Sequence, residues 1–504
     1  MKEKKRLLTN MASYAILQIV NMLVGLFLPR MYLAVYGSEI NGVVSTVNSF
    51  ISYFSYLEAG LGLTMIHSLF KPLAANDTDA LNGLLAFSKK KYKQISYVYF
   101  VLVVSASLLF PYLNPTSALG TFEFSMLVFV IGFYGALDFY SMAKYRVLLT
   151  ADRKEYVISN AMIAAQGLRF VLIWILLKFK LSVAIVKIVP ILTLLLRSLI
   201  LQQYVRKTYP SVNFKENPTN LEGKNQQIDA LLLQISISTS ISLPTIIISQ
   251  FSGFKEANVY AVYNLVISSI VSILSALSSG VSPMLGRSIA QGEKINETYD
   301  LYDYIVSYLI AVFFSTTVVM ILPFVALYTN VVDDTNYIYP SYAVLFCVWA
   351  AIYSYRIPVT AVVNAAAIYR QNRASNILNL LIQVFLGSVA TKKYGIRGLL
   401  VVMIIAAVQR NVSLAINNDR EVLHFGIRKF IIRHILICCA IFASYSTLTF
   451  RVYARELSVI SWCIYGILSF IWELVFCGFI WLLLDKTKIF GVIRVIKNRF
   501  VKNK

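Results

Sequence analysis

Six ionisable side chains lie well inside long apolar stretches of the 504-residue sequence. They are Glu58, Asp138, Arg169, Lys187, Arg356 and Glu473. A charged group costs roughly 2.5 to 3.5 kcal/mol at the centre of an apolar helix in a bilayer, so it normally faces a wet cavity or an opposite charge. Buried cations suit the binding of anionic oxygens, and buried carboxylates can exchange a proton or another cation. The pattern predicts a polar site inside an apolar chain.

Two further arginines lie nearer to the ends of such stretches, where a long cationic side chain can reach lipid headgroups. Pro29 precedes Arg30, removes a backbone donor and bends the helix, which frees carbonyl groups that need a packed or wet environment. We therefore expect Arg30 to line a cavity, with the headgroup position as the alternative. Arg197 lies about one and a half turns from the end of its stretch, and we expect it at the headgroups.

The composition requires a membrane. The chain is 58% hydrophobic and 14% charged, and its mean hydropathy is +0.68, which is outside the range of soluble proteins. Because about 20 apolar residues cross a bilayer core, the sequence predicts an all-α integral membrane protein with about 14 transmembrane helices. The predicted spans are residues 12–35, 42–69, 93–112, 121–148, 156–177, 181–202, 228–251, 257–284, 301–327, 337–367, 374–390, 397–417, 430–449 and 459–483.

The net charge of +22 is explained by where the cations lie. Clusters of Lys and Arg at 2–6, 88–93, 203–227 and 486–504 all fall on one side if the N- and C-termini are cytoplasmic. These clusters suit anionic lipids rather than nucleic acid. One segment argues against this topology, because the polar span 374–390 is followed by cations that would lie outside. If this segment does not cross, the later spans invert.

The chain consists of two related halves. A shift of about 216 residues aligns Gln18 and Pro29 with Gln234 and Pro244, and it aligns "SEIN" at 38–41 with "KEAN" at 255–258. The repeats are separated by six spans, so both enter the membrane in the same direction. We predict two pseudo-symmetric six-helix lobes and two extra C-terminal helices. The predicted boundaries are 1–205 for the first lobe, 206–227 for a cytoplasmic linker, 228–418 for the second lobe and 419–504 for the extra helices and basic tail.

The repeat suggests a partner for one acid. It carries Asp138 to residue 354, within one turn of Arg356, so these two side chains are expected to face each other as a structural or a functional ion pair. Glu58 stands in "YLEAGLG" beside small residues that permit close packing, and burial can keep its carboxyl neutral.

Catalysis has little support in the sequence. The Asp77–Asp79 pair in "ANDTDALNG" precedes a predicted helix, where Asp77 or Thr78 is an ordinary N-cap. The sequence contains no nucleophile elbow and no phosphate-binding loop, and its three histidines lack a ligand spacing. We expect neither an enzyme nor a metal site.

The stretch "LPRMYLAVYGSEINGVVSTVNSFISYFSYLEAGLGLTMIHSLFKPLA" at 28–74 resembles the opening of Wzx-type polysaccharide flippases of the multidrug/oligosaccharidyl-lipid/polysaccharide exporter superfamily. The resemblance implies a bacterial cytoplasmic membrane protein that moves an undecaprenyl-diphosphate-linked oligosaccharide for capsule or envelope synthesis, by alternating access through a cationic cavity. It makes Arg30 a cavity cation, with Arg169, Lys187 and Arg356 adding to the field. Asn41, the asparagine of the "G-x-E-x-N-G" pattern, joins these candidate substrate-binding residues. Glu58 and Asp138 are the candidates for proton or sodium coupling, and no other cofactor is implied.

Two other functions remain open at this point. A multidrug antiporter of the same superfamily would bind cationic compounds and should carry acidic rather than basic groups in its spans. A membrane-embedded polysaccharide polymerase or ligase would need a large external loop with catalytic residues, which the sequence lacks. Expected partners are the lipid-linked substrate, anionic lipids and other membrane proteins of polysaccharide assembly. One chain with two lobes suffices as a functional monomer.

Overall fold

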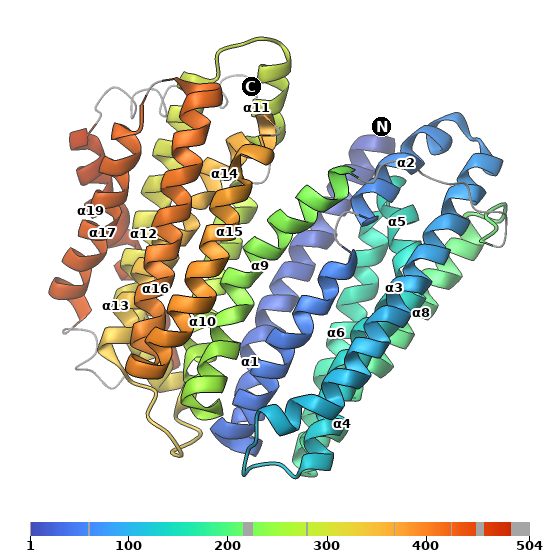
Figure 1. Cartoon of the computed structure of the whole chain (residues 1–504), viewed down its shortest axis with the longest axis horizontal. Helices are drawn as coiled ribbons and strands as arrows, with labels where there is room; N and C mark the ends of the chain where they lie inside the picture. Colours follow the sequence, from blue (N-terminus) through green and yellow to red (C-terminus); the bar gives the residue numbers. More distant parts are fainter. Residues whose placement is uncertain are drawn as a thin grey trace. The chain divides into compact units, whose positions relative to one another are not determined.

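The computed structural model describes residues 2–58, 61–214, 225–278, 281–366, 368–424, 426–449 and 458–484, and these form helices joined by short connections (Figure 1). The chain divides into two compact units, Met1–Asn258 and Val259–Lys504. The division falls after Asn258 rather than within the expected linker at 206–227, because the helix that follows this linker packs against the first helix of the chain.

The helices of the first unit run nearly without interruption. They are α1 (Lys2–Ser52), the 3-10 helix η1 (Tyr53–Glu58), α2 (Leu61–Ala75), α3 (Thr78–Leu113), α4 (Thr121–Ser141), α5 (Ala143–Ala151), α6 (Glu155–Lys178), α7 (Val183–Val186), α8 (Val189–Thr208) and α9 (Asn225–Ser252). In Figure 1, α9 follows α1 along much of its length, and α1 also packs against α6. Asp77 caps α3 by accepting a hydrogen bond from the Ala80 N–H at 3.0 Å, which confirms its reading as an N-cap.

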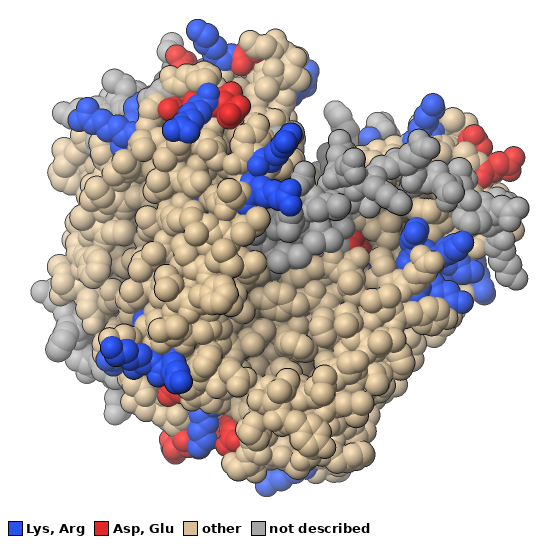
Figure 2. Space-filling model, in the orientation of Figure 1, with Lys and Arg blue, Asp and Glu red and all other residues tan. Residues whose placement is uncertain are grey.

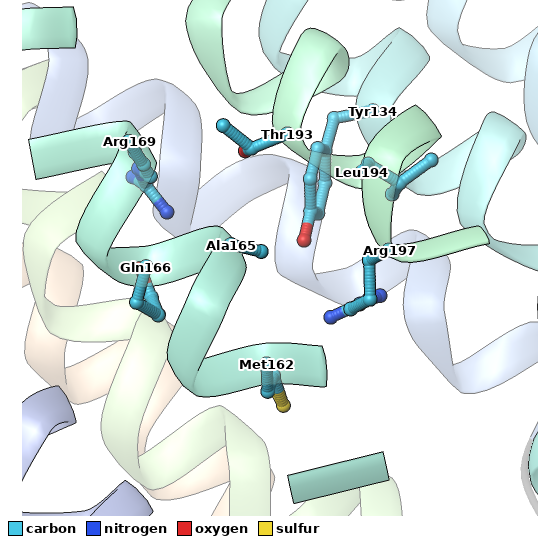
Figure 3. A pocket seen from close by; sticks show the side chains of 8 residues that line it. All are labelled: Tyr134, Met162, Ala165, Gln166, Arg169, Thr193, Leu194 and Arg197. Atoms are coloured by element: carbon cyan, nitrogen blue, oxygen red, sulfur yellow. The ribbon is translucent and has the colours of Figure 1, made fainter. Parts of the chain in front are cut away.

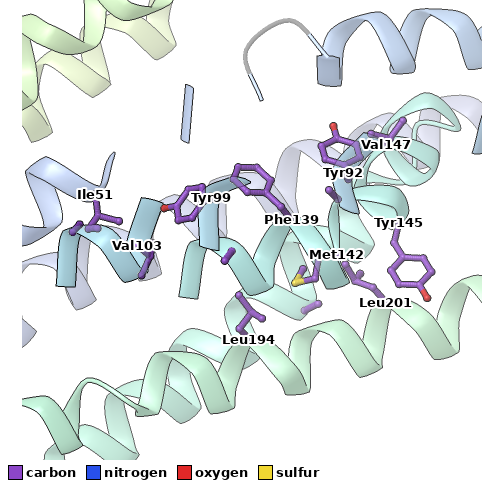
Figure 4. Packing of buried hydrophobic residues seen from close by; sticks show 14 of the residues in the cluster. Ile51, Tyr92, Tyr99, Val103, Phe139, Met142, Tyr145, Val147, Leu194 and Leu201 are labelled. Carbon is purple, nitrogen blue, oxygen red and sulfur yellow. The ribbon is translucent and has the colours of Figure 1, made fainter. Parts of the chain in front are cut away.

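Helices α3 and α4 form the centre of the apolar core of this unit (Figure 4). Two glycines one turn apart on α4 allow the close approach. A Cβ on Gly135 would lie 2.2 Å from the Tyr99 hydroxyl, and one on Gly132 would lie 2.6 Å from the Val103 side chain. Small residues at this spacing let two apolar helices pack backbone to side chain. The core therefore holds α4 firmly, and α4 carries Asp138.

Glycines with positive φ divide the long helices at equivalent positions of the two repeats. Gly37 (φ 77°) interrupts α1 between the predicted spans 12–35 and 42–69. Gly253 (φ 93°) separates α9 from α10 (Phe254–Ser278). Glycine adopts this conformation without the steric cost that a side chain would add. The two breaks are 216 residues apart, which is the shift that aligns the sequence repeats.

The second unit contains the remaining described helices. They are α10, which begins just before the division, α11 (Val281–Ala290), α12 (Asn296–Thr329), α13 (Pro340–Ser354), α14 (Arg356–Ala366), the short turn η2 (Arg370–Asn372), α15 (Arg373–Leu381), the π-turn η3 (Ile382–Leu386), α16 (Gly387–Asn418), the π-turn η4 (Asp419–Leu423), α17 (Arg428–Ser444), the π-turn η5 (Tyr445–Thr449) and α19 (Val459–Leu484). The extra helices α17 and α19 pack against α12 and so belong to this unit.

The polar span 374–390 is half of a helical hairpin that turns at Gly395, inside the range of α16. The Asn379 amide donates to the Ala406 carbonyl at 2.7 Å, and the Gln409 amide donates to the Ser375 hydroxyl at 3.3 Å. These cross-links pair the segment before the turn with the segment after it in opposite directions. The polar groups that weaken the hydropathy of this span therefore bind the neighbouring segment.

The described part of the chain contains eleven helical stretches that are long and apolar enough to cross a membrane. Two of them, Thr9–Glu58 and Arg370–Leu423, each combine two predicted spans. In each unit, the face shown in Figure 2 carries its Lys, Arg, Asp and Glu side chains toward the helix ends, with an uncharged surface between them. The fold is therefore that of an all-helical, multi-pass membrane protein.

Candidate functional site: a cationic pocket in the first unit

A small polar pocket, open to the surface and with a cavity volume of about 30 Å3, lies among α4, α6 and α8. Its lining consists of Tyr134 from α4, Met162, Ala165, Gln166 and Arg169 from α6, and Thr193, Leu194 and Arg197 from α8. In Figure 3 the hydroxyl of Tyr134 points into the space between the two guanidinium groups. Two arginines, a hydroxyl pair and an amide offer many donors to an anionic or sugar-bearing ligand.

Arg197 is buried and ion-paired. Its Nη2 lies 2.5 Å from Oδ1 of Asp138, and its Nε donates to the Met142 sulfur at 3.1 Å. The second carboxylate oxygen of Asp138 lies 2.9 Å from Nη2 of Arg146. The headgroup position expected for Arg197 is therefore wrong, because the nearby acid on α4 offsets the cost of burial. Both oxygens of Asp138 are bound by arginines of its own unit, whereas the sequence had suggested Arg356.

Arg169 faces the same pocket without a carboxylate. Its Nε has no hydrogen-bond partner within the described part of the chain, and the same is true of Oε1 of Gln166. The Gln166 amide donates to Asn21 of α1 at 3.1 Å, which fixes its orientation. A buried donor without a partner is costly unless a ligand or water satisfies it. Arg169 is thus the cation of the pocket that is best placed to receive an anion.

Lys187 lies next to this region, at the break between α7 and α8. It is only 9% exposed, and its Nζ lies 4.0 Å from the centre of the Tyr32 ring of α1. Arg169 is near enough to both Lys187 and Tyr32 to interact with them electrostatically. The structure therefore brings together two of the predicted substrate-binding cations, Arg169 and Lys187.

The two candidate coupling acids also meet at one place. The Tyr92 hydroxyl donates to Oε1 of Glu58 at 2.9 Å. Arg146, which binds Asp138, also interacts electrostatically with Glu58 and Tyr92. Arg146 thus links the two acids of this unit, Glu58 and Asp138.

Two predicted cations are not among the residues that line the pocket. Arg30 follows Pro29 inside α1 and is half-buried, but it is not among the lining residues. Arg356 begins α14 in the second unit, and its guanidinium carbon lies 4.4 Å from the centre of the Tyr353 ring.

Asn41 is buried and bonded to its own repeat equivalent. Its amide nitrogen donates to Oδ1 of Asn258 at 2.8 Å, and both side chains are buried. These are the last residues of "SEIN" and "KEAN", the motifs that the repeat aligns. The amide of Asn41 is therefore engaged in helix packing.

We predict that Asn41→Ala lowers the free energy of unfolding by about 1–3 kcal/mol, because it leaves a buried amide of Asn258 without this partner. The double variant Asn41→Ala/Asn258→Ala should cost less than the sum of the two single changes, since the pair is lost only once. Thermal unfolding of the four proteins in detergent measures this coupling. Strictly additive effects would contradict the pairing.

A second charged cluster was missed by the sequence analysis. Arg433 of α17 binds Asp300 of α12 at 2.6 Å and also binds Asp303, and the Tyr355 hydroxyl donates to Asp303 at 2.9 Å. Lys429 adds a contact of 2.6 Å to Asp300. The i, i+3 spacing of the two aspartates was visible, but their partner is 130 residues away. Glu473 of α19, which was predicted, is fully buried elsewhere in this unit, within 3.8 Å of the Cys477 sulfur.

Solved structures with a similar arrangement of helices place this fold among known ones. An inward-facing multidrug resistance MATE family transporter of the MOP superfamily matches with a TM-score of 0.58 and 14% identity, over 86% of this chain and 99% of that one. The lipid II flippase MurJ, in an inward closed conformation, matches with a TM-score of 0.62 and 12% identity, over 94% and 99%. An outward-facing MATE transporter matches with a TM-score of 0.55 and 15% identity, over 82% and 95%.

No family model matches the sequence, and no curated protein matches it. The structural likeness covers almost the full length of both kinds of neighbour. The chain therefore has the fold shared by MATE transporters and the MurJ flippase.

Proposed function

We propose that this protein is a flippase that moves an undecaprenyl-diphosphate-linked oligosaccharide from the cytoplasmic to the outer leaflet of a bacterial membrane, for capsule or envelope polysaccharide synthesis. The observation that carries the proposal is the cationic pocket of the first unit, in which Arg169 retains a buried donor that no described residue satisfies. The fold shared with a lipid II flippase supports the same class of transport.

The chemistry of the pocket suits a diphosphate headgroup. A guanidinium can bind two phosphate oxygens at once, in a fork that a lysine does not offer. Arg197 adds a second guanidinium. Asp138 neutralises part of its charge, which lowers the affinity for the ligand and lets it be released. The hydroxyls of Tyr134 and Thr193 and the amide of Gln166 offer hydrogen bonds to sugar hydroxyls.

Further cations extend this role. We assign Lys187 to the same positively charged region as Arg169, since the two interact electrostatically. We keep Arg30 and Arg356 as cations that contact the substrate along the transport path. Asn41 is left out of the binding set because its amide is bonded to Asn258. The polyprenyl tail stays in lipid, so the chain needs to shelter only the polar headgroup.

The alternative within the same fold is a multidrug antiporter, as in the MATE neighbours. The pocket argues against it, because both of its charged lining residues are arginines, which repel cationic compounds. The deciding experiment reconstitutes the full chain in proteoliposomes and measures transfer of a labelled undecaprenyl-diphosphate oligosaccharide beside transfer of a cationic dye. Movement of the lipid and not of the dye is expected. Movement of the dye alone would favour the antiporter.

Proton or sodium coupling would act through Glu58 and Asp138. We predict that Glu58→Gln keeps the bond to Tyr92 but makes transport insensitive to an imposed proton or sodium gradient, because the amide no longer titrates. Transport in vesicles with and without each gradient measures this. If transport by Glu58→Gln depends on the gradients as in the wild type, Glu58 has no part in coupling. If wild-type transport is the same with and without either gradient, the protein is not coupled to protons or sodium.

We place the protein in the cytoplasmic membrane with both termini in the cytoplasm, where the basic segments contact anionic lipids. One chain carries the whole pocket of the first unit, so a monomer is sufficient for binding. Other membrane proteins of polysaccharide assembly are the proposed partners, since the transported headgroup must be made on one side and used on the other.

A further inference from the structure

Among the described residues of the second unit, Arg410 of α16 is the most deeply buried cation for which no hydrogen-bond partner is found. It is only 3% exposed, and Nε, Nη1 and Nη2 all lack a hydrogen-bond partner within the described part of the chain. A guanidinium has five N–H donors and cannot lose its proton in a protein, so burial without a partner carries a high cost.

A second arginine increases this cost. Arg356 is near enough to Arg410 to repel its charge, and Nε of Arg356 also lacks a partner within the described residues. The Tyr353 hydroxyl, another buried group without a partner, belongs to the same cluster, because the Tyr353 ring lies under the Arg356 guanidinium. Neither arginine forms a described ion pair. The cluster is thus a set of donors that lacks an acceptor.

The internal repeat identifies the residue of the first unit that is equivalent to Arg410. The break between α4 and α5 at Met142 corresponds to the break between α13 and α14 at Tyr355, 213 residues later, so the offset here is three residues shorter than the 216 that separate Gly37 and Gly253. The same offset takes the start of α7, Val183, to Ile396, directly after the turn at Gly395, and takes Arg197 to Arg410. These two arginines therefore occupy equivalent positions beside equivalent breaks.

The acid is not repeated. At this offset Asp138 corresponds to Ala351 and Arg146 corresponds to Val359, both of which are buried. Arg197 is neutralised by Asp138, whereas the position equivalent to Asp138 in the repeat of Arg410 is an alanine. The helix is nevertheless held in register, because the Asn411 and Asn418 amides donate to the carbonyls of Ile352 and Val359 at 2.6 and 2.8 Å. The cation is kept in place, while the residues that the structure describes offer it no counterion.

We propose that Arg410, Arg356 and Tyr353 form a second oxyanion-binding site, in which a phosphate or carboxylate oxygen of the transported molecule supplies the missing counterion. Because Arg410 is almost inaccessible here, the anion reaches it in a conformation in which this part of the second unit opens. The choice of the transported headgroup as the source of the anion rests on the proposed function. Two groups of such a headgroup have this chemistry, the diphosphate and the carboxylate of an acidic sugar.

The first test is the melting temperature of the full-length protein in detergent without ligand. Arg410→Met should raise it by about 2–4 °C, because an apolar side chain replaces an unpaired buried charge. The matched change Arg197→Met should lower it, since it leaves Asp138 with one cation fewer. A lower melting temperature for Arg410→Met would show that Arg410 stabilises the fold, and would overturn the proposal.

The second test is the rise in melting temperature caused by inorganic pyrophosphate or by glucuronate. We expect at least one of them to stabilise the wild type, and Arg410→Met to lose at least half of that rise while Arg410→Lys keeps part of it. A rise in melting temperature with pyrophosphate assigns the site to the diphosphate. A rise with glucuronate alone assigns it to the carboxylate of an acidic sugar. A full rise in Arg410→Met, or no rise in the wild type, would contradict the site.

Arg169→Met separates this inference from the proposed function. If the rise in melting temperature depends on Arg169 and not on Arg410, the pocket of the first unit binds the anion and the second site is disproved. If it depends on Arg410 and not on Arg169, the second site binds the anion and the binding role of the first pocket is disproved.

Discussion

Replacing Arg169 by Met is expected to reduce transport of the lipid-linked oligosaccharide at least tenfold. The change removes the one lining guanidinium that has no carboxylate partner, and a hydrogen bond from a charged donor to phosphate contributes roughly 1.5–3 kcal/mol, which is about a factor of ten to a hundred in affinity. Arg169→Lys should transport at a rate between those of the wild type and Arg169→Met, because lysine keeps the charge but cannot bind two phosphate oxygens at once. Initial rates in proteoliposomes at matched protein level measure the effect.

The control lies on the same helix. Lys178 ends α6, is exposed, and packs its Nζ 3.7 Å from the centre of the Trp174 ring. Lys178→Met removes one positive charge from α6 without touching the pocket, and it should leave transport within about twofold. Equal losses in the two variants would mean that the overall charge of the helix matters and the pocket does not.

Replacing Arg433 by Leu is expected to lower the free energy of unfolding by about 3–5 kcal/mol. The change leaves Asp300 and Asp303, one turn apart on α12, without the buried guanidinium that binds both. It also releases α17 from α12, since this cluster provides charged contacts between them. The midpoint of thermal or chemical unfolding in detergent measures the loss.

Lys429→Met is the matched comparison, because it removes a cation from the same cluster. The Lys429 side chain is 53% exposed, so its pair with Asp300 should contribute no more than about 1 kcal/mol. The triple variant Asp300→Asn/Asp303→Asn/Arg433→Met, which removes all three charges, should recover part of the stability lost in Arg433→Leu. An Arg433→Leu protein as stable as Lys429→Met would disprove the buried ion pair.

Much of the fold follows from the sequence, because hydropathy and length decide which segments can cross a bilayer. The predicted spans correspond to helices in the described part of the chain, and the polar span 374–390 forms half of a hairpin. The hydropathy pattern does not reveal where a helix bends sharply without an intervening loop. Gly37 and Gly395 turn the chain inside segments that remain helical on both sides, so the spans there are continuous in the structure.

The site was predictable only in part. Arg169 and Lys187 were found because a charge inside an apolar run is conspicuous, and the structure places them within electrostatic range of each other. Arg197 was misplaced because distance from a helix end says nothing about an acid on a neighbouring helix. Arg410 was missed although it lies inside a predicted span, and its meaning depends on the loss of an acid at the equivalent of position 138. Pairing across 59 to 130 residues is a property of packing, which periodicity does not encode.

The bond between Asn41 and Asn258 joins equivalent positions of the two sequence repeats. In a homodimer with two-fold symmetry, a residue on the axis touches the same residue of the other copy, and asparagine can satisfy itself there because its amide both donates and accepts. Positions 41 and 258 are such a pair inside a single chain. Either asparagine can be substituted alone, but each substitution removes a buried hydrogen bond of the other, so the pair restrains change at both positions.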